Sequence, residues 1–239
     1  MYQSEDSSPV APWVPNLLEQ VSGSLESATP QQILEWAFET FGDELCIGTA
    51  FGQSGMALIE MATAINPDVD IFYIDTGLFF PETYELIARA EQRYGRPFRR
   101  VTPKLSLKEQ AQAHGPELWK TNSDRCCAVR KVVPLREALA GRTAWLTALR
   151  RDQSETRRNA PVVSWNERHQ AVKVAPLVNV TEREVWKYVL DRDVPYNPLH
   201  NQGYPSIGCA PCTSQVRPGD DLRAGRWAGS AKTECGLHL

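Results

Sequence analysis

Short apolar runs alternate with helical patterns along the first half of this chain, and this alternation limits the fold more than any other feature. The runs ELCIGTA (44–50) and VDIFYID (69–75) have the length and apolar character of buried strands. Each is followed by a loop that contains glycine and then by a helical pattern, at residues 56–65 and 81–95. Strands that alternate with helices form a parallel, doubly wound sheet. The sequence therefore predicts an α/β fold with a mostly parallel sheet, with further strands near 97–101, 143–148 and 171–175.

Two helix starts are marked by capping boxes. Thr29 and Thr181 are each followed by Gln or Glu three residues later, and Pro30 occupies the first helical position of the earlier helix. Gly42 predicts the end of that helix. We therefore expect helices over residues 30–41 and 181–191.

Two loops follow the first two predicted strands, at the sheet edge where parallel α/β proteins bind ligands. In FGQSG, Gly52 and Gly55 would let an anion approach the backbone near a helix N-terminus, and Ser54 would add a hydroxyl. The second loop is Asp75-Thr76-Gly77. Each motif is weak alone, and ordinary tight turns between strand and helix remain the alternative.

Charge is unevenly distributed, although the net charge is only −3. The first 88 residues contain 14 acidic residues and no lysine or arginine, whereas residues 89–173 contain 19 basic and 8 acidic residues. Such a block is either a solvated face or a site for a polyanion such as a nucleotide or RNA. No apolar run approaches the roughly 18 residues that a membrane span needs, and the polar N-terminus does not resemble a signal peptide. We therefore expect a cytoplasmic protein with a mobile segment over residues 1–14.

Four of the six cysteines form two pairs, Cys126-Cys127 and Cys209-x-x-Cys212. Four thiolates are a complete ligand set for a structural zinc ion or an iron–sulfur cluster. The adjacent pair favours the cluster, because neighbouring helical side chains point apart and a cluster is wider than one ion. The alternatives are buried thiols or a vicinal disulfide for the first pair, and chance or a redox dithiol for the second.

The other two cysteines differ in their surroundings. Cys46 lies inside an apolar run and is assigned to the core, whereas Cys235 lies in the polar C-terminal run KTECGLHL. Nearby cations favour the thiolate, which is the nucleophilic form of cysteine. These are Lys232, His238, Arg223 and Arg226. Cys235 is therefore either a nucleophile or an ordinary exposed thiol.

Four arginines lie within the ten residues LRRDQSETRR (149–158). Guanidinium groups match the oxygens of phosphate and sulfate, so this segment favours anion binding over a solvent-exposed loop. His114, His169 and His200 have no evident partner and are expected to be structural.

Six segments together resemble one family, the assimilatory sulfonucleotide reductases, and among them the bacterial thioredoxin-dependent adenylyl-sulfate reductases. The segments are DTGLFFPETY, CCAVRKVVPL, LRRDQSETR, KVAPL, PYNPLHNQGYPSIGCAPCT and GRWAGSAKTECGLH. They extend from about residue 45 to the C-terminus, and the last two are the most specific. The chain departs from the family pattern at Ala148, where glycine is usual, and in the form of the FGQSG loop, so the fine contacts to the nucleotide are the least certain part of the resemblance.

The resemblance implies a fold and a set of site residues. The fold is a Rossmann-like domain of the adenine-nucleotide hydrolase (PP-loop) type, with its phosphate loop at 49–55 and a flexible C-terminal tail. One 4Fe–4S cluster per chain would be held by Cys126, Cys127, Cys209 and Cys212, and Cys235 would be the catalytic nucleophile. The implied substrate-binding residues are Gly52, Ser54, Gly55, Asp75, Thr76, Gly77, Lys131, Arg151, Arg158, Arg223, Arg226 and His238.

The implied activity is reduction of adenosine 5′-phosphosulfate to sulfite and AMP, in sulfate assimilation and cysteine biosynthesis. A Cys235 S-sulfo intermediate would be resolved by thioredoxin or glutaredoxin, with no nucleic-acid partner and no membrane. The expected organisation is an N-terminal extension (1–25), a sulfonucleotide-binding domain with the cluster (26–215) and a mobile tail that carries Cys235 (216–239). A homo-oligomer is as compatible with the sequence as a monomer.

Three other functions remain as alternatives. The first is reduction of 3′-phosphoadenylyl sulfate, or of both nucleotides. The second is a tRNA-thiolating enzyme on the same fold, which the absence of an SGGxDS loop disfavours. The third is a non-enzymatic zinc module.

Overall fold

The computed structural model describes residues 15–217 and 219–237, and the expected mobile segment at 1–14 lies outside these ranges. The described residues form a six-stranded sheet of order β3-β2-β1-β4-β6-β5. Its strands are β1 (Leu45–Thr49), β2 (Asp70–Ile74), β3 (Arg99–Val101), β4 (Ala144–Leu146), β5 (Val163–Asn166) and β6 (Ala171–Val174). All neighbours pair in parallel except β5 and β6. The predicted doubly wound, mostly parallel α/β sheet is confirmed.

The antiparallel strand β5 was not predicted. Its four residues VSWN mix apolar and polar side chains, and only the first and last are buried. A short, half-exposed strand at a sheet edge lacks the continuous apolar run that marked the central strands.

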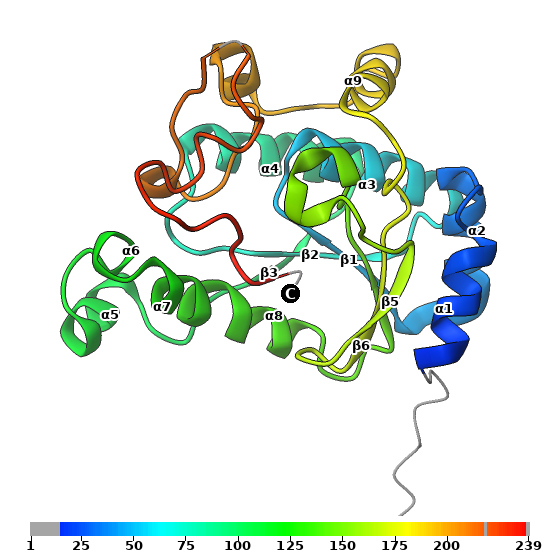
Figure 1. Cartoon of the computed structure of the whole chain (residues 1–239), viewed down its shortest axis with the longest axis horizontal. Coiled ribbons are helices and arrows are strands. Elements are labelled where there is room, and N and C mark those ends of the chain that lie inside the picture. Colours follow the sequence, from blue (N-terminus) through cyan, green and yellow to red (C-terminus); the bar gives the residue numbers. More distant parts are fainter. Residues whose placement is uncertain (1–14, 218, 238–239) are drawn as a thin grey trace, which may run out of the picture.

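Helices cover both faces of the sheet (Figure 1). On one face lie α2 (Pro30–Phe41), α3 (Gln53–Ile65), α4 (Pro81–Arg93) and α9 (Glu182–Asp191). On the other lie α5 (Leu107–His114), α6 (Leu118–Thr121), α7 (Ser123–Cys127) and α8 (Val133–Ala138). None of the helices in the described ranges has the length and apolar character that crossing a membrane would require.

The alternation of side chains along the strands divides the core between these two faces. Ile47 and Leu146 pair in register and belong to the larger apolar cluster, whereas Cys46 and Trp145 pair in register and belong to the smaller one beneath α8. Cys46 is completely buried, as expected for a core residue.

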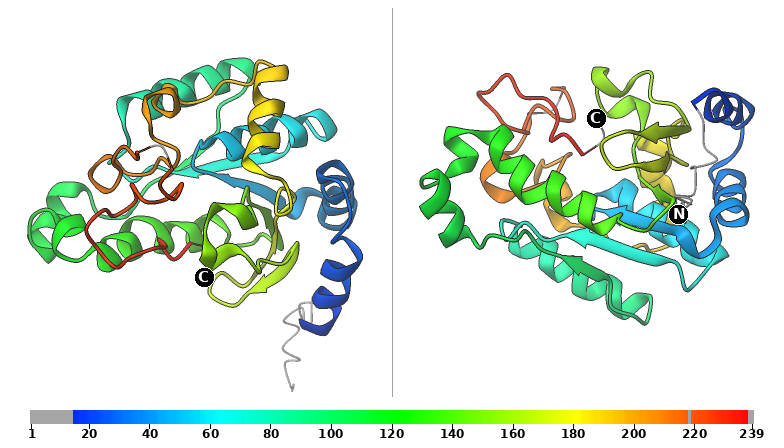
Figure 2. Two further views of the ribbon diagram at one scale, coloured as in Figure 1. Left: turned by 45° about the horizontal axis from the view of Figure 1, so that its top comes forward. Right: turned by 90° about the horizontal axis from the view of Figure 1, so that it is seen from below.

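The helix ends follow their sequence signals. Thr29 and Thr181 accept hydrogen bonds from Gln32 and Glu184 in complete capping boxes, and α2 ends at Phe41 with Gly42 as its C-cap. The first described helix, α1 (Pro15–Ser24), lies beside β5 (Figure 2). There the Ser22 hydroxyl accepts a hydrogen bond from the backbone N–H of Val163 at 3.2 Å.

Candidate active site

A cleft of about 230 Å³ opens at the carboxyl ends of β1 and β4. The chain leaves β1 toward β2 and β3 on one side, and β4 continues toward β6 on the other. This reversal of strand order is where open α/β sheets bind their ligands. Residues from the β1–α3 connection, the segment after β4, the α7–α8 region and the C-terminal segment all line the cleft. The fold therefore brings together motifs that lie as much as 187 residues apart, from Gly48 to Cys235.

The floor of the cleft is the start of α3. We expected FGQSG to be a loop, but Gln53, Ser54 and Gly55 form the first turn of the helix and are buried. The first turn of this helix also packs closely on β1: a Cβ on Gly55 would lie 2.7 Å from the Thr49 hydroxyl oxygen. Gly52 is the N-cap residue, so the free N–H groups of the first turn lie at the cleft.

In the second loop, the neighbouring residues Asp75 and Thr76 have different roles. The buried carboxylate of Asp75 accepts hydrogen bonds from the Gly77 backbone and the Tyr84 hydroxyl, each at 2.8 Å, and pairs with Arg100. Burial and this hydrogen bond raise the pKa of Tyr84 to about 12. Asp75 thus shapes the loop, whereas Thr76 lines the cleft.

The arginine-rich segment contains two adjacent pairs, Arg150-Arg151 and Arg157-Arg158, and one arginine of each pair lines the cleft. Arg150 and Arg157 line it, and the completely buried Arg150 bonds to Asp152 at 2.8 Å and to the Ser54 hydroxyl. Arg151 instead pairs with Glu26, and the exposed pair Arg158–Glu155 lies away from the cleft lining. The structure therefore places the two arginines that the resemblance implied outside the cleft, and their neighbours inside.

The four paired cysteines are close to one another. Cys126 and Cys127 are buried on α7, whereas Cys209 is the N-cap and Cys212 the last residue of the short 3₁₀ helix η6 (Ala210–Cys212). Burial and the charges of the other three thiols raise the pKa of Cys126 to about 11. Within the described ranges, no three histidine, cysteine or acidic side chains converge tightly enough to hold a single metal ion.

Lys131 reaches the cleft through a local change in helix geometry. Between α7 and α8 the chain forms a π-helical turn, η2 (Ala128–Val132), just before Pro134, which has no N–H to continue an α-helical ladder. Lys131 is buried and lines the cleft together with Cys209 and Cys235. Burial and the charge of Arg226 oppose its protonation, but the combined charges of nearby thiols, Cys209 and Cys235 foremost, raise the pKa of Lys131 above its ordinary value.

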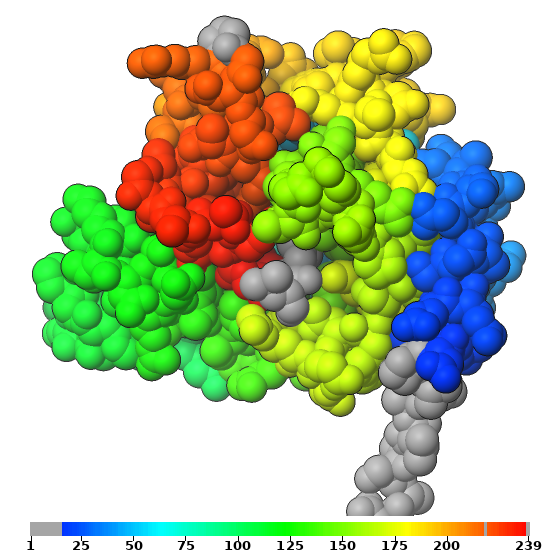
Figure 3. Space-filling view, in the orientation of Figure 1, coloured from blue at the N-terminus to red at the C-terminus, as the bar shows by residue number. Residues whose placement is uncertain are grey.

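The C-terminal segment crosses the cleft between the α7–α8 region and the loop after β4 (Figures 1 and 3). Within its described part, the chain from residue 216 has no helix or strand, as expected, and is tied to residues 213–214 by the Thr213–Arg226 bridge. The buried Trp227 ring lies within 6.0 Å of four cations, namely Lys131, Arg223, Arg226 and Lys232. Cys235, Arg223 and Arg226 line the cleft, and His238 lies outside the described residues.

Sequence reasoning missed Arg150, Arg157 and Trp227. The run of four arginines signalled the segment but not which members face inward, because this part of the chain is two short 3₁₀ turns, η3 (Arg151–Gln153) and η4 (Glu155–Arg157), without a long-range periodicity. Residue type alone did not mark Trp227 as a site residue. Its cluster of cations could have been suspected from Arg223, Arg226 and Lys232 around it in sequence.

Fold and site together define an α/β protein of the PP-loop class, with a cationic cleft at the strand ends and a thiol held within it. The sequence profile of the phosphoadenosine phosphosulfate reductase domain matches residues 44–215. The chain belongs to this family.

Relatives cover nearly the whole chain. It is 47% identical over 238 residues to the adenosine 5′-phosphosulfate reductase of Salinibacter ruber, which covers 99% of this chain and 94% of the relative. It is 49% identical over 207 residues to adenosine 5′-phosphosulfate reductase 1 of Bacillus subtilis, covering 86% and 89%.

Solved structures agree with the fold class. The phosphoadenylyl-sulfate reductase of Candida auris, determined as a phosphate complex, superposes with a TM-score of 0.75 at 33% identity, over 85% of this chain and 98% of the other. Yeast FAD synthetase in complex with FAD superposes with a TM-score of 0.56 at 13% identity, covering 90% and 70%, which shows a shared fold alone. The expected PP-loop fold type is confirmed.

Proposed function

We propose that this chain reduces adenosine 5′-phosphosulfate to sulfite and AMP in sulfate assimilation, and so supplies reduced sulfur for cysteine biosynthesis. Membership of the family makes the chain a sulfonucleotide-reducing oxidoreductase, and relatives named for this nucleotide are 47–49% identical to it. One structural observation carries the proposal. The C-terminal segment brings the thiol of Cys235 into a cleft whose lining includes several cationic side chains and a helix N-terminus.

The cationic residues would bind the anionic end of the substrate. Lys131, Arg150 and Arg226 line the cleft on different sides, and Arg150 leaves one guanidinium nitrogen buried without a hydrogen-bond partner. A buried, unpartnered N–H group is costly, and an anion that accepts from it removes that cost. Gly208 leaves room for the Arg226 guanidinium, since a Cβ at residue 208 would overlap it.

The Cys235 thiolate would attack the sulfur of the sulfonucleotide. An S–S bond forms while the bond from sulfur to the phosphate oxygen breaks, and AMP leaves with that electron pair. Lys131 and the arginines would offset the charge that builds on the bridging oxygen. The enzyme is then an S-sulfocysteine. A thioredoxin or glutaredoxin dithiol attacks the Cys235 sulfur, releases sulfite and supplies the two electrons of the reduction.

The residues present fit a 4Fe–4S cluster. Cys126, Cys127, Cys209 and Cys212 supply the four thiolates that such clusters use, and the other three lie close enough to Cys126 for their charges to act on it. The Thr76 hydroxyl lies 3.3 Å from Cys209 Sγ, which is the kind of hydrogen bond that tunes a ligand sulfur. A bound cluster would supply a fixed charge and a structural link beside the cleft. A cytoplasmic location fits both the thiols and the thioredoxin partner.

Mass spectrometry of the protein after reaction tests the function and the nucleophile together. Anaerobically purified protein is mixed with adenosine 5′-phosphosulfate without reductant, and the tryptic peptide after Lys232 is analysed. A sulfite-sized adduct on Cys235 with stoichiometric AMP is expected. An adduct on another cysteine would overturn the assignment of the nucleophile, and AMP release without an adduct would overturn the mechanism.

Reduction of 3′-phosphoadenylyl sulfate is a second candidate. It is favoured by the likeness to the Candida auris reductase, whose name refers to that nucleotide. The ratio of kcat/KM for the two nucleotides decides between them, and we expect it to favour the substrate without the 3′-phosphate.

A further inference from the structure

The residues around Cys235 are held by contacts to three separate parts of the molecule. Lys232 donates to the Ser123 carbonyl at 3.0 Å and pairs with Asp124 at 2.7 Å, at the start of α7. The carbonyl of Gly236 accepts from Arg168 at 3.1 Å, in the β5–β6 turn. Between these anchors lies Glu234, which immediately precedes the proposed nucleophile.

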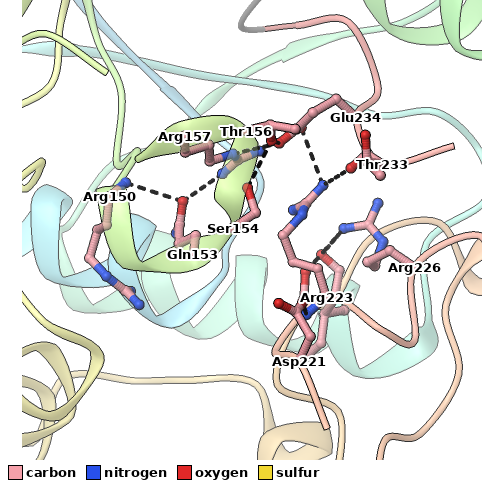
Figure 4. Close-up of polar contacts among 12 residues, drawn as sticks. Arg150, Gln153, Ser154, Thr156, Arg157, Asp221, Arg223, Arg226, Thr233 and Glu234 are labelled. Carbon is pink, nitrogen blue, oxygen red and sulfur yellow. Dashed lines mark hydrogen bonds and ion pairs between the residues drawn. The ribbon is translucent and has the colours of Figure 1, made fainter. Parts of the chain in front are cut away.

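Glu234 has the most enclosed of these contacts (Figure 4). Its carboxylate accepts from Arg157 Nε at 2.7 Å and Nη2 at 2.8 Å, a bidentate pair, and from Arg223 Nη2 at 3.2 Å. The Thr156 hydroxyl donates to it at 3.2 Å. The Glu234, Arg157 and Arg223 side chains are only 9%, 10% and 13% exposed.

Arg157 and Arg223 together hold the two residues that immediately precede Cys235. Arg223 Nη2 also donates to the Thr233 carbonyl at 2.9 Å, so one guanidinium holds the backbone of residue 233 and the carboxylate of residue 234. Both arginines line the cleft, and so does Cys235. The Glu234 carboxylate therefore pairs with two cations that an anionic ligand could otherwise contact, next to the Cys235 thiol.

We propose that Glu234 is a positioning residue, whose carboxylate clamps the C-terminal segment to Arg157 and Arg223 and thereby holds Cys235 in the cleft. The proposal rests on the proposed role of Cys235 as nucleophile. Release of this clamp loosens the segment between its other anchors, which are the Lys232 contacts at α7, the Gly236–Arg168 hydrogen bond and the packing of Leu237 on the smaller apolar cluster. The remaining cations of the cleft bind the substrate. The clamp determines the fraction of time during which the Cys235 thiol faces that substrate.

Loss of one partner from a buried, bidentate ion pair leaves the other charges uncompensated, so the closed arrangement should become much less populated. Glu234→Gln keeps the size of the side chain and removes its charge, and Arg157→Met removes the bidentate partner. Glu155→Gln is the matched control, because Glu155 is a nearby carboxylate that forms an exposed pair with Arg158.

Limited trypsin digestion without nucleotide measures release of the segment directly. The Lys232 side chain is only 7% exposed, so cleavage after Lys232 requires the segment to leave its site. We expect this cleavage, followed by mass spectrometry, to be at least about tenfold faster in Glu234→Gln and in Arg157→Met. The double variant should be no faster than the faster single variant, because both changes break the same interaction. The Glu155→Gln protein should be cleaved at the wild-type rate.

A second readout separates positioning from a general loss of structure. We expect Glu234→Gln to bind AMP at least as tightly as the wild type, because two cleft arginines are released from a carboxylate. The same variant should form the Cys235 adduct at least about tenfold more slowly in a single turnover. A damaged fold would weaken both steps together.

Cleavage of Glu234→Gln after Lys232 at the wild-type rate would overturn the proposal. Acceleration that is equal at tryptic sites throughout the chain, or additive effects in the double variant, would overturn it as well. Failure of the wild type to form any adduct would instead count against the proposed function, and the cleavage assay needs no substrate, so the two failures are distinguishable.

Discussion

The floor and the cover of the cleft are built by different forces. The floor consists of β1, β4 and the start of α3, where residues such as Ile47, Leu58 and Leu146 are completely buried in one apolar cluster. The cover consists of residues 205–217 and 219–237, which are held by 3₁₀ turns, backbone hydrogen bonds and pairs such as Arg157–Glu234. Apolar burial stabilises whole domains, whereas a few charged pairs can be exchanged for water without unfolding the rest.

This contrast separates the positions that determine stability from those that determine chemistry. A residue of the floor should affect the free energy of unfolding, and through it everything else. A residue of the cover should affect the position or reactivity of the thiol, with little effect on stability. The following variants test this separation.

The largest effect is expected at Cys235, near the C-terminal end of the cover. Cys235→Ser should lower sulfite formation by at least about a thousandfold, because a hydroxyl is a far weaker nucleophile than a thiolate. Its free energy of unfolding should stay within about 0.5 kcal/mol of the wild type, as measured by denaturant titration. Sulfite production at an undiminished rate would remove Cys235 from the mechanism.

Leu146→Ala tests the floor. It should lower the free energy of unfolding by about 3 kcal/mol, because it removes a completely buried side chain and leaves a cavity in the middle of the sheet. Leu190, which is 61% exposed, is the control: Leu190→Ala should cost less than about 0.5 kcal/mol. Equal costs at the two sites, measured by denaturant titration, would contradict the placement of the core.

Gly55→Ala tests the junction of strand and helix. The added Cβ would lie 2.7 Å from the Thr49 hydroxyl oxygen, so either the Thr49 side chain or the N-terminus of α3 must shift. Overpacking of this kind costs about 1–3 kcal/mol. Calorimetry should also show weaker AMP binding, since the same turn faces the cleft. Restored stability and AMP affinity in the double variant Thr49→Ala, Gly55→Ala would identify this contact as the cause.

Low pH should weaken the fold through two buried histidines. Burial, assisted by Arg168 for His169, lowers the pKa of both His169 and His200 from 6.5 to about 4. Between these values the unfolded chain binds protons that the folded chain does not, so the free energy of unfolding falls as pH decreases from about 6.5 toward 4. At pH about 5.5 the loss should be about 1 kcal/mol per histidine.

The double variant His169→Phe, His200→Phe isolates this contribution from that of the carboxylates. Its stability, measured by denaturant titration across the same pH range, should fall less steeply than that of the wild type. An identical slope would show that the two histidines are not held neutral by the fold.

The smallest effect is expected at Arg158. The structure pairs it with Glu155 on the surface, with both side chains at least 70% exposed, so Arg158→Met should change AMP affinity by less than about twofold and stability by less than about 0.5 kcal/mol. Arg150→Met should weaken AMP binding by at least about tenfold, because its buried guanidinium faces the cleft. Calorimetry on the two variants compares them directly, and a larger effect at Arg158 would restore the placement that the resemblance implied.

Much of the fold was predictable because its signals are local. Apolar runs marked β1, β2, β4 and β6, capping boxes marked α2 and α9, and their alternation indicated the parallel sheet. The edge strand β5 and the early start of α3 were missed. The first lacks an apolar run, and the second lies in Gln53, Ser54 and Gly55, which precede the apolar run of the helix.

The candidate site was predictable in its chemistry and less so in its geometry. Residue type and spacing indicated four thiols in two pairs, a separate thiol near the C-terminus and an arginine-rich segment, since these depend on composition along the chain. Packing among segments far apart in sequence determines three features of the site. These are which arginine of each adjacent pair faces the cleft, how a π-helical turn places Lys131 there, and how Glu234 lies between Arg157 and Arg223. Long-range contacts of this kind leave no local pattern in the sequence. They depend on the shape and charge of surfaces that exist only once the sheet has formed.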